Sequence, residues 1–156
     1  MWDCGYNGDY WGQYALRCLP QDVWDEWQDK FAFVSLAGSD GRRLTRSFCE
    51  NRDIIILSER IVPKDCADEG SPAVRYFVFV VLHEAAHAIC RHRPPNEISP
   101  EEDAVQEAEA NSFAFRTFND FLTKRNHPDL LAFTEEELKR AQAANQEAMK
   151  AALVRH

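Results

Sequence analysis

The sequence predicts an α+β fold in one domain that spans residues 1–156. Short runs rich in β-branched and aromatic residues fall between residues 31 and 58, as is typical of strands. From residue 71 onward, long segments begin with helix-capping signals. A chain of 156 residues is one domain by its length and buries about 70% of its unfolded surface. We therefore expect a small antiparallel or mixed sheet packed on helices.

The first third of the chain is expected to contain one short helix and three strands. Residues 1–19 are rich in Gly, Tyr and Trp without a clear period, so they form either an ordered arm or a cover over apolar surface. Residues 20–30 predict a short amphipathic helix, whose inner side carries Val23, Trp24 and Trp27. A turn is expected at 38–41. The strands are expected at 31–36, 44–48 and 54–58.

A long helix through the core is expected next. It begins at Ser71-Pro72, a cap residue followed by proline at the first helical position, and ends near residues 91–93. Its residues are apolar on all sides, which is typical of a helix surrounded by the core. The β-branched and aromatic cluster at 76–81 alone would indicate a strand, but the length and the cap favour the helix.

Two further helices complete the expected fold. Ser99 and Glu102 form a capping-box pattern, so a helix should begin at Pro100 and reach about Lys124. The same pattern predicts a last helix over 134–153. The inner face of this last helix carries only alanines, Leu138 and Met149. We expect it to be a peripheral helix or an interaction surface.

The core helix carries the pattern His83-Glu84-Ala85-Ala86-His87. At 3.6 residues per turn, His83 and His87 lie one above the other on one face and can bind a single metal ion. Neutral imidazoles suit zinc, and the Glu84 carboxylate can accept the proton that the metal loosens from a bound water. A metal also explains polar rings on a buried helix, because buried polar groups cost free energy unless something satisfies them. The pattern therefore predicts a Zn²⁺ site with Glu84 as general base.

The helix over 100–124 is expected to supply a third ligand. Its apolar stripe should contain Ala104, Ala108, Phe115, Phe118 and Leu122. Glu107 and Asn111 lie beside that stripe, whereas Glu109 lies about 200° from Glu107 on the wetter side. We therefore expect Glu107 to be the ligand, with Glu109 and Asp103 as the alternative carboxylates. Three protein ligands and a fourth position open to water form the pattern of catalytic zinc.

Together, His83-Glu84-x-x-His87 and Glu107-x-x-Ala110-Asn111 resemble the gluzincin metallopeptidases. Residues 109–114 are similar to the ImmA/IrrE branch and its small relatives, and the likeness covers about residues 50–120. The resemblance implies that His83, His87 and Glu107 bind zinc and that Glu84 is general base and acid. It also implies a zincin-like fold, with Asn111 in the place of an aspartate that supports a ligand histidine.

The resemblance further implies a substrate strand beside the zinc. These peptidases pair extended substrate with an edge strand before the active-site helix, which assigns that role to Ile54, Ile55, Ile56, Leu57 and Ser58. The expected function is hydrolysis of peptide bonds in a protein or peptide, with a repressor or other regulatory protein as a candidate substrate. The alternative is a non-catalytic zinc-binding module that engages a protein partner without turnover.

Composition favours an enzyme of the cytoplasm. The net charge of −8 argues against direct binding of nucleic acid and offers no basic helix for a membrane surface. The N-terminus has no signal-peptide pattern, and the longest apolar run, residues 76–82, is too short to span a bilayer. Five cysteines at irregular spacing are typical of reduced thiols.

Some other polar residues have competing interpretations. His92, at the end of the core helix, is interpreted as a solvated terminal residue favoured by the helix dipole. Cys90, about one turn past His87, is interpreted as a small buried thiol in preference to a group that approaches the metal. A Cys4 thiolate that keeps the enzyme latent is a less favoured hypothesis. The donor that stabilises the oxyanion has four candidates: His127, Tyr10, Tyr14 and Tyr76.

Overall fold

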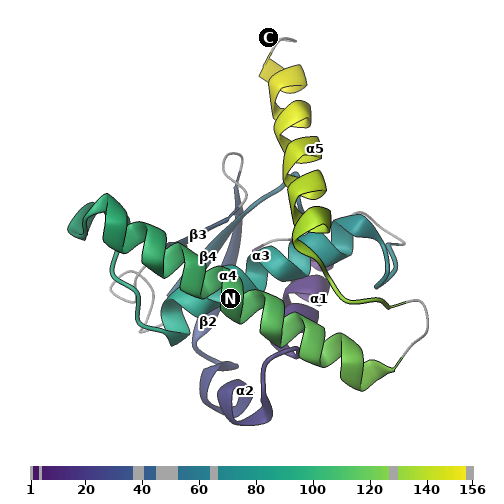
Figure 1. Cartoon of the computed structure of the whole chain (residues 1–156). Helices are drawn as coiled ribbons and strands as arrows, with labels where there is room; N and C mark the ends of the chain where they lie inside the picture. Colours follow the sequence, from purple (N-terminus) through teal and green to yellow (C-terminus); the bar gives the residue numbers. More distant parts are fainter. Residues whose placement is uncertain are drawn as a thin grey trace.

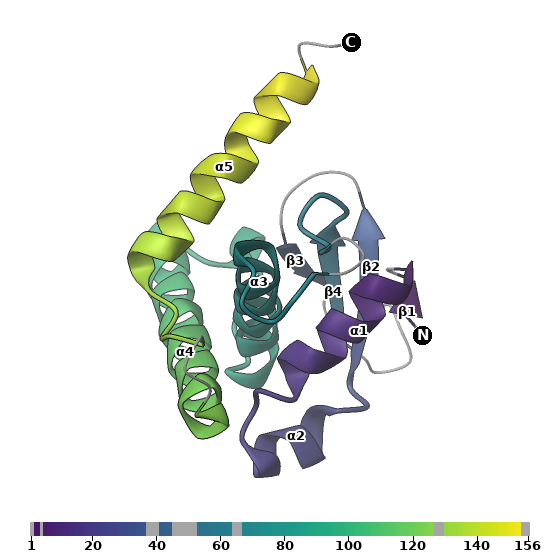
Figure 2. The same cartoon turned by 90° about the vertical axis from the view of Figure 1, so that its right-hand side faces the viewer.

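Helices and a small mixed sheet make up the described part of the chain in the computed structural model, so the α+β class is confirmed. The described residues are 2–3, 5–36, 41–44, 53–63, 67–126 and 130–153. Figure 2 shows helix α3 (Pro72–Ile89) between the sheet and helix α4 (Pro100–Arg125). None of the described helices is long and apolar enough to cross a membrane.

The sheet has four described strands in the order β1-β2-β4-β3. In chain order, they are β1 (Trp2–Asp3), β2 (Phe31–Leu36), β3 (Gly41–Leu44) and β4 (Asp53–Ser58). β1, β2 and β4 are parallel, and β3 is antiparallel to β4. The strands expected at 31–36 and 54–58 are therefore confirmed. The strand expected at 44–48 shares only its first residue with β3, and residues 37–40 and 45–52 lie outside the described part.

β4 is an inner strand, which corrects the prediction that residues 54–58 form an open edge. β2 pairs with β4 along its whole length, and on the other side β3 pairs with Ile54 through Leu57. The side chains of Ile55 and Leu57 are fully buried. Because both sides of β4 are paired, this strand cannot take an extended substrate as an additional neighbour.

The N-terminal segment belongs to the core. Helix α1 (Gly5–Leu16) packs against α3 and β2, as Figure 2 shows. The core residues of α1 and the following turn are Trp11, Ala15, Leu16, Cys18 and Leu19. Helix α2 (Gln21–Trp27) follows as predicted, with Trp27 buried and its ring stacked on Phe31.

α3 begins where the cap and the proline predict. The Ser71 hydroxyl accepts a hydrogen bond from the Val74 backbone N–H at 3.4 Å, and Pro72 occupies the first turn. Every residue from Val74 to Leu82 is buried. The helix through the core is therefore confirmed, because burial of the whole segment outweighs the local β-propensity of residues 76–81.

The C-terminal end of α3 folds back toward its last turn. The helix ends at Ile89, before the expected residues 91–93, and Arg91 adopts a left-handed φ of 57°. This conformation lets the His92 backbone N–H donate to the carbonyl of His87 at 2.9 Å. The turn brings His92 back beside the last turn of α3.

α4 has the predicted capping box but a shorter buried face than expected. The Ser99 hydroxyl accepts from the Glu102 N–H at 3.2 Å, and the Glu102 carboxylate accepts from the Ser99 N–H at 3.1 Å. Buried residues of α4 begin at position 110 and are Ala110, Ala114, Thr117, Phe118 and Leu122. Ala104 and Ala108, which the sequence pattern assigns to the apolar stripe, are exposed because the core ends before them.

Helix α5 (Glu135–Leu153) extends away from the other helices, as Figure 1 shows. Leu138 is buried and Met149 is partly buried. The first turn of α5 is fixed to the core by the buried Arg75, whose Nε donates to Glu137 Oε1 at 2.6 Å.

Candidate metal centre

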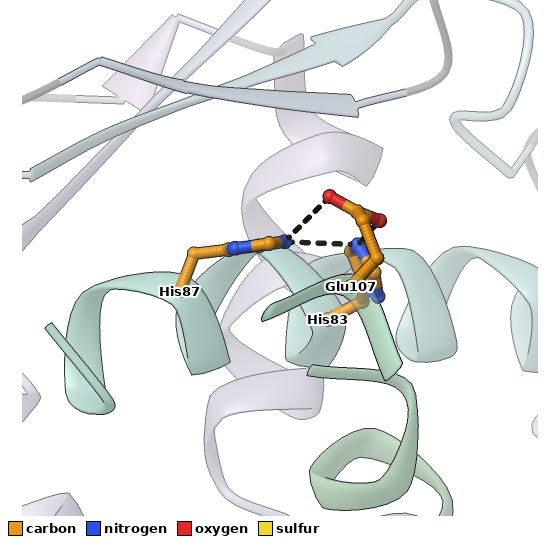
Figure 3. A group of neighbouring side chains, drawn as sticks. All are labelled: His83, His87 and Glu107. Carbon is orange, nitrogen blue, oxygen red and sulfur yellow. Dashed lines mark hydrogen bonds and ion pairs between the residues drawn. The ribbon is translucent and has the colours of Figure 1, made fainter. Parts of the chain in front are cut away.

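His83 and His87 face each other from successive turns of α3. Their Nε2 atoms are 3.1 Å apart, and each side chain is 15% exposed. Figure 3 shows both rings directed to one point above the helix. The spacing of four residues on a helix produces this arrangement, as the sequence predicts.

Glu107 supplies a carboxylate from α4. Its Oε2 lies 3.3 Å from His83 Nε2 and its Oε1 lies 3.4 Å from His87 Nε2. The three side chains are drawn together in Figure 3, and their donor atoms form a candidate metal-binding group. Glu107 is 46% exposed, so solvent can reach the group from the side of α4. The expected ligand set, His83, His87 and Glu107, is therefore brought together.

The separations between the donor atoms fit a zinc ion. Zinc binds imidazole nitrogen and carboxylate oxygen at about 2.0–2.2 Å, so neighbouring ligand atoms of a tetrahedral site lie about 3.3 Å apart. The three separations here are 3.1, 3.3 and 3.4 Å. A group that can hold a metal ion is thus present among the described residues, and its two nitrogens and one oxygen suit zinc.

Asn111 orients the ring of His83. The Asn111 Oδ1 atom lies 3.1 Å from His83 Nδ1. An amide oxygen only accepts hydrogen bonds, so Nδ1 carries the proton and donates it. The lone pair of His83 is therefore on Nε2, which faces the metal centre. This contact is the one that the resemblance assigns to Asn111.

His92 orients the ring of His87, which corrects its interpretation as a solvated terminal residue. His92 is only 7% exposed, and its Nδ1 lies 2.9 Å from His87 Nδ1. Its Nε2 lies 3.1 Å from Glu109 Oε2. A carboxylate accepts, so His92 donates from Nε2 and accepts at Nδ1 from the Nδ1–H of His87. His87 thereby keeps its own Nε2 lone pair for the metal.

The contact between His92 and His87 depends on a turn that the sequence does not predict and on a histidine that the sequence does show. The left-handed conformation of Arg91, which returns His92 to the helix, has no signal in the sequence because arginine is not a typical residue for it. The histidine five residues after His87, next to the end of the helix, is the signal in the sequence from which this contact could have been predicted. Glu109 is thus engaged with His92, and the alternative that it replaces Glu107 as ligand is not supported by these contacts.

Glu84 lies next to His83 on α3 and is 9% exposed. Burial lowers the pKa of His83, but the hydrogen bond to Glu107 and the charges of Glu84 and Glu107 outweigh it, so the pKa is raised. The pKa of Glu107 is lowered, mainly by its hydrogen bond to His83 and against the effect of burial. Without a metal, both shifts therefore favour a charged His83 imidazolium beside an ionised Glu107 carboxylate.

These shifts predict opposite pH responses for the metal-free and the zinc-loaded protein. A raised His83 pKa contributes stability that is present below pH about 6.5 and is lost as the pH rises through the folded-state pKa. A lowered Glu107 pKa contributes stability that is present above pH about 4.3 and is lost as the pH falls. The midpoint of thermal unfolding of the metal-free protein should therefore be lower at pH about 8 than at pH about 6.

Zinc affinity should rise over the same interval, because both imidazoles must be neutral to bind the ion. Thermal unfolding at both pH values, with and without zinc, checks this. His83→Ala is the control, and its metal-free form should lose much of the pH effect. If the unfolding midpoint of metal-free His83→Ala depends on pH as strongly as that of the wild type, the titrating proton belongs to another group.

Of the expected oxyanion donors, Tyr14 lies away from the metal group. The ring of Tyr14 packs edge-on against Phe121, at 5.5 Å between centroids. Phe121 lies about 21 Å beyond Glu107 along α4, so Tyr14 is remote from the metal group. The other candidates are Tyr10, exposed on α1, and Tyr76, buried in α3. His127 and Cys4 lie outside the described residues.

No family model, curated protein or solved structure matches this chain. The chemistry of the centre is therefore inferred from its own geometry.

Proposed function

We propose that this protein is a zinc-dependent metallopeptidase of the gluzincin type, similar to the ImmA/IrrE branch. One observation carries the proposal: two nitrogens and one carboxylate lie at the mutual separations of a tetrahedral zinc site, on an HExxH helix. The partly exposed Glu107 supports an accessible fourth position. The free thiols of Cys18 and Cys90 support a reducing compartment such as the cytoplasm.

The chemistry divides between the ion and the side chains. Zinc would polarise the scissile carbonyl and lower the pKa of a coordinated water toward about 7. Glu84 accepts the proton of the attacking water and passes it to the leaving amine. Asn111 and His92 hold the two ligand rings with Nε2 toward the ion, which limits the reorganisation that binding requires.

Hydrolysis of a mixed substrate tests the proposal directly. The purified chain, loaded with one equivalent of zinc, is incubated with denatured casein, and the products are read by mass spectrometry. We expect new peptides, loss of cleavage with a chelator and recovery on adding zinc. Stoichiometric zinc without any cleavage would favour the alternative, a regulatory module that binds a protein partner.

β3 is the strand that we propose for holding an extended substrate. It is the outer strand beyond β4 in the described sheet, and it packs against α3. Neighbouring N–H groups of a strand point to opposite sides, so one of Arg42 and Arg43 donates outward. Proline at that position should raise KM and leave the zinc content unchanged, because only a substrate contact is lost.

The two proline variants are each other's control. Proline at the inward position removes a bond to β4 and should lower the unfolding temperature more than it raises KM. KM, zinc content and thermal unfolding are measured on both. Wild-type KM in both folded variants would exclude β3 as the substrate strand.

A further inference from the structure

A second group of metal-binding side chains lies beside the first. Cys90, His92 and Glu109 each offer one donor atom, and these atoms lie within 4.8 Å of one another. One of the contacts already exists, because His92 Nε2 lies 3.1 Å from Glu109 Oε2. The group is formed by the end of α3, the left-handed turn at Arg91 and the exposed side of α4.

The donor set differs in kind from that of the first group. It contains one sulfur, one imidazole nitrogen and one carboxylate oxygen, a combination that suits zinc and cobalt. His92 is 7% exposed, whereas the Glu109 side chain is 59% exposed, so an ion can enter from solvent. Metal distances of about 2.0–2.3 Å would require the donors, which lie within 4.8 Å of one another, to draw together by side-chain rotation.

We propose that Cys90, His92 and Glu109 form a second site for a divalent transition-metal ion, and that an ion bound there weakens the first site. His92 is the link, because it contacts both groups. The ion replaces the proton between His92 Nε2 and Glu109, and it replaces the proton of the Cys90 thiol.

Proton positions make the two sites antagonistic. When the second ion takes the Nε2 lone pair, the neutral His92 ring must carry its proton on Nδ1. The Nδ1–H of His92 then faces the Nδ1–H of His87, and the two nitrogen atoms are 2.9 Å apart. Without the second ion, His92 Nδ1 instead accepts the hydrogen bond from His87. The Cys90 thiol, for its part, releases its proton to solvent when it binds the second ion. One of the two facing protons must be lost or one ring must turn away, so His87 becomes a poorer ligand for the first ion.

The effect of each ion on the affinity of the other site is reciprocal, and this sets its size and direction. Coupling between two binding sites changes both affinities by the same factor, typically about 5- to 150-fold. Excess metal should thus inhibit the enzyme by filling the second site. The antagonism rests on the proposed first site, whereas binding at the second site does not require peptidase activity.

Titration with Co²⁺ separates the two sites. Only the second site contains sulfur, so a thiolate-to-cobalt charge-transfer band in the near ultraviolet reports on it alone. We expect this band in zinc-loaded wild type and, at about 5- to 150-fold lower Co²⁺ concentration, in His83→Ala, where the opposing ion is absent. Cys90→Ser should lose the band and keep one equivalent of zinc and full cleavage.

The outcomes distinguish this proposal from the proposed function. Absence of the band in both the wild type and His83→Ala, or its persistence in Cys90→Ser, would refute the second site. A band with equal affinity in the wild type and in His83→Ala would refute the antagonism. Both readouts are spectroscopic, so a protein without any peptidase activity would still give a decisive result.

Discussion

His83→Ala, His87→Ala and Glu107→Ala are each expected to abolish stoichiometric zinc binding. Each variant removes one of three donors that lie 3.1–3.4 Å apart, and the remaining two cannot complete a tetrahedral site. Zinc at 100 times its Kd would stabilise the wild type by about 2.7 kcal/mol, because the ion binds only the folded state. The variants should gain almost none of this.

Metal content and thermal unfolding with and without zinc measure both effects. Asp103→Ala is the matched control, since it removes a carboxylate from the same helix and should keep one equivalent of zinc. Glu109→Ala should keep zinc with about 10- to 100-fold weaker affinity, because it acts through His92. Zinc retained in Glu107→Ala and lost in Glu109→Ala would identify Glu109 as the ligand.

Glu84→Gln is expected to lower cleavage by at least ~10² and to leave the zinc content unchanged. The amide has the shape of the carboxylate but cannot accept the proton of the attacking water. Because Glu84 is not one of the three grouped donors, the variant should bind zinc like the wild type.

The ratio of kcat to KM for a defined peptide, measured beside zinc content, checks this prediction. Glu84→Asp is the companion variant, which keeps the charge and moves it by one methylene. It should retain more activity than Glu84→Gln at equal zinc. Wild-type rates in zinc-loaded Glu84→Gln would exclude Glu84 as the base.

Local signals predicted four of the five described α-helices, all except α1, and the two histidines of the first ligand group. The caps at Ser71 and Ser99 define where α3 and α4 begin, and the four-residue spacing brings His83 and His87 together. These features depend on neighbours within one or two turns. A sequence contains that information directly.

Features that depend on distant partners were not predicted. Strand propensity locates β4, but whether it is an inner or an outer strand depends on its pairing with β2 and β3. His92 depends on one left-handed residue, Arg91, whose conformation is set by the packing of the turn. The exposure of Ala104 depends on where the core ends along α4.

The burial profile of α4 has a consequence for local stability. Residues 100–109 contain no buried side chain, although Glu107 lies among them. Polar contacts hold this segment to the end of α3, such as the hydrogen bond from the Arg93 N–H to the Gln106 side chain at 2.7 Å. An ion bound by Glu107 and two α3 histidines would tether it far more firmly. Amide hydrogen exchange over residues 100–109 should therefore be governed by metal release, while the half of α4 anchored by Phe118 and Leu122 opens only with the core.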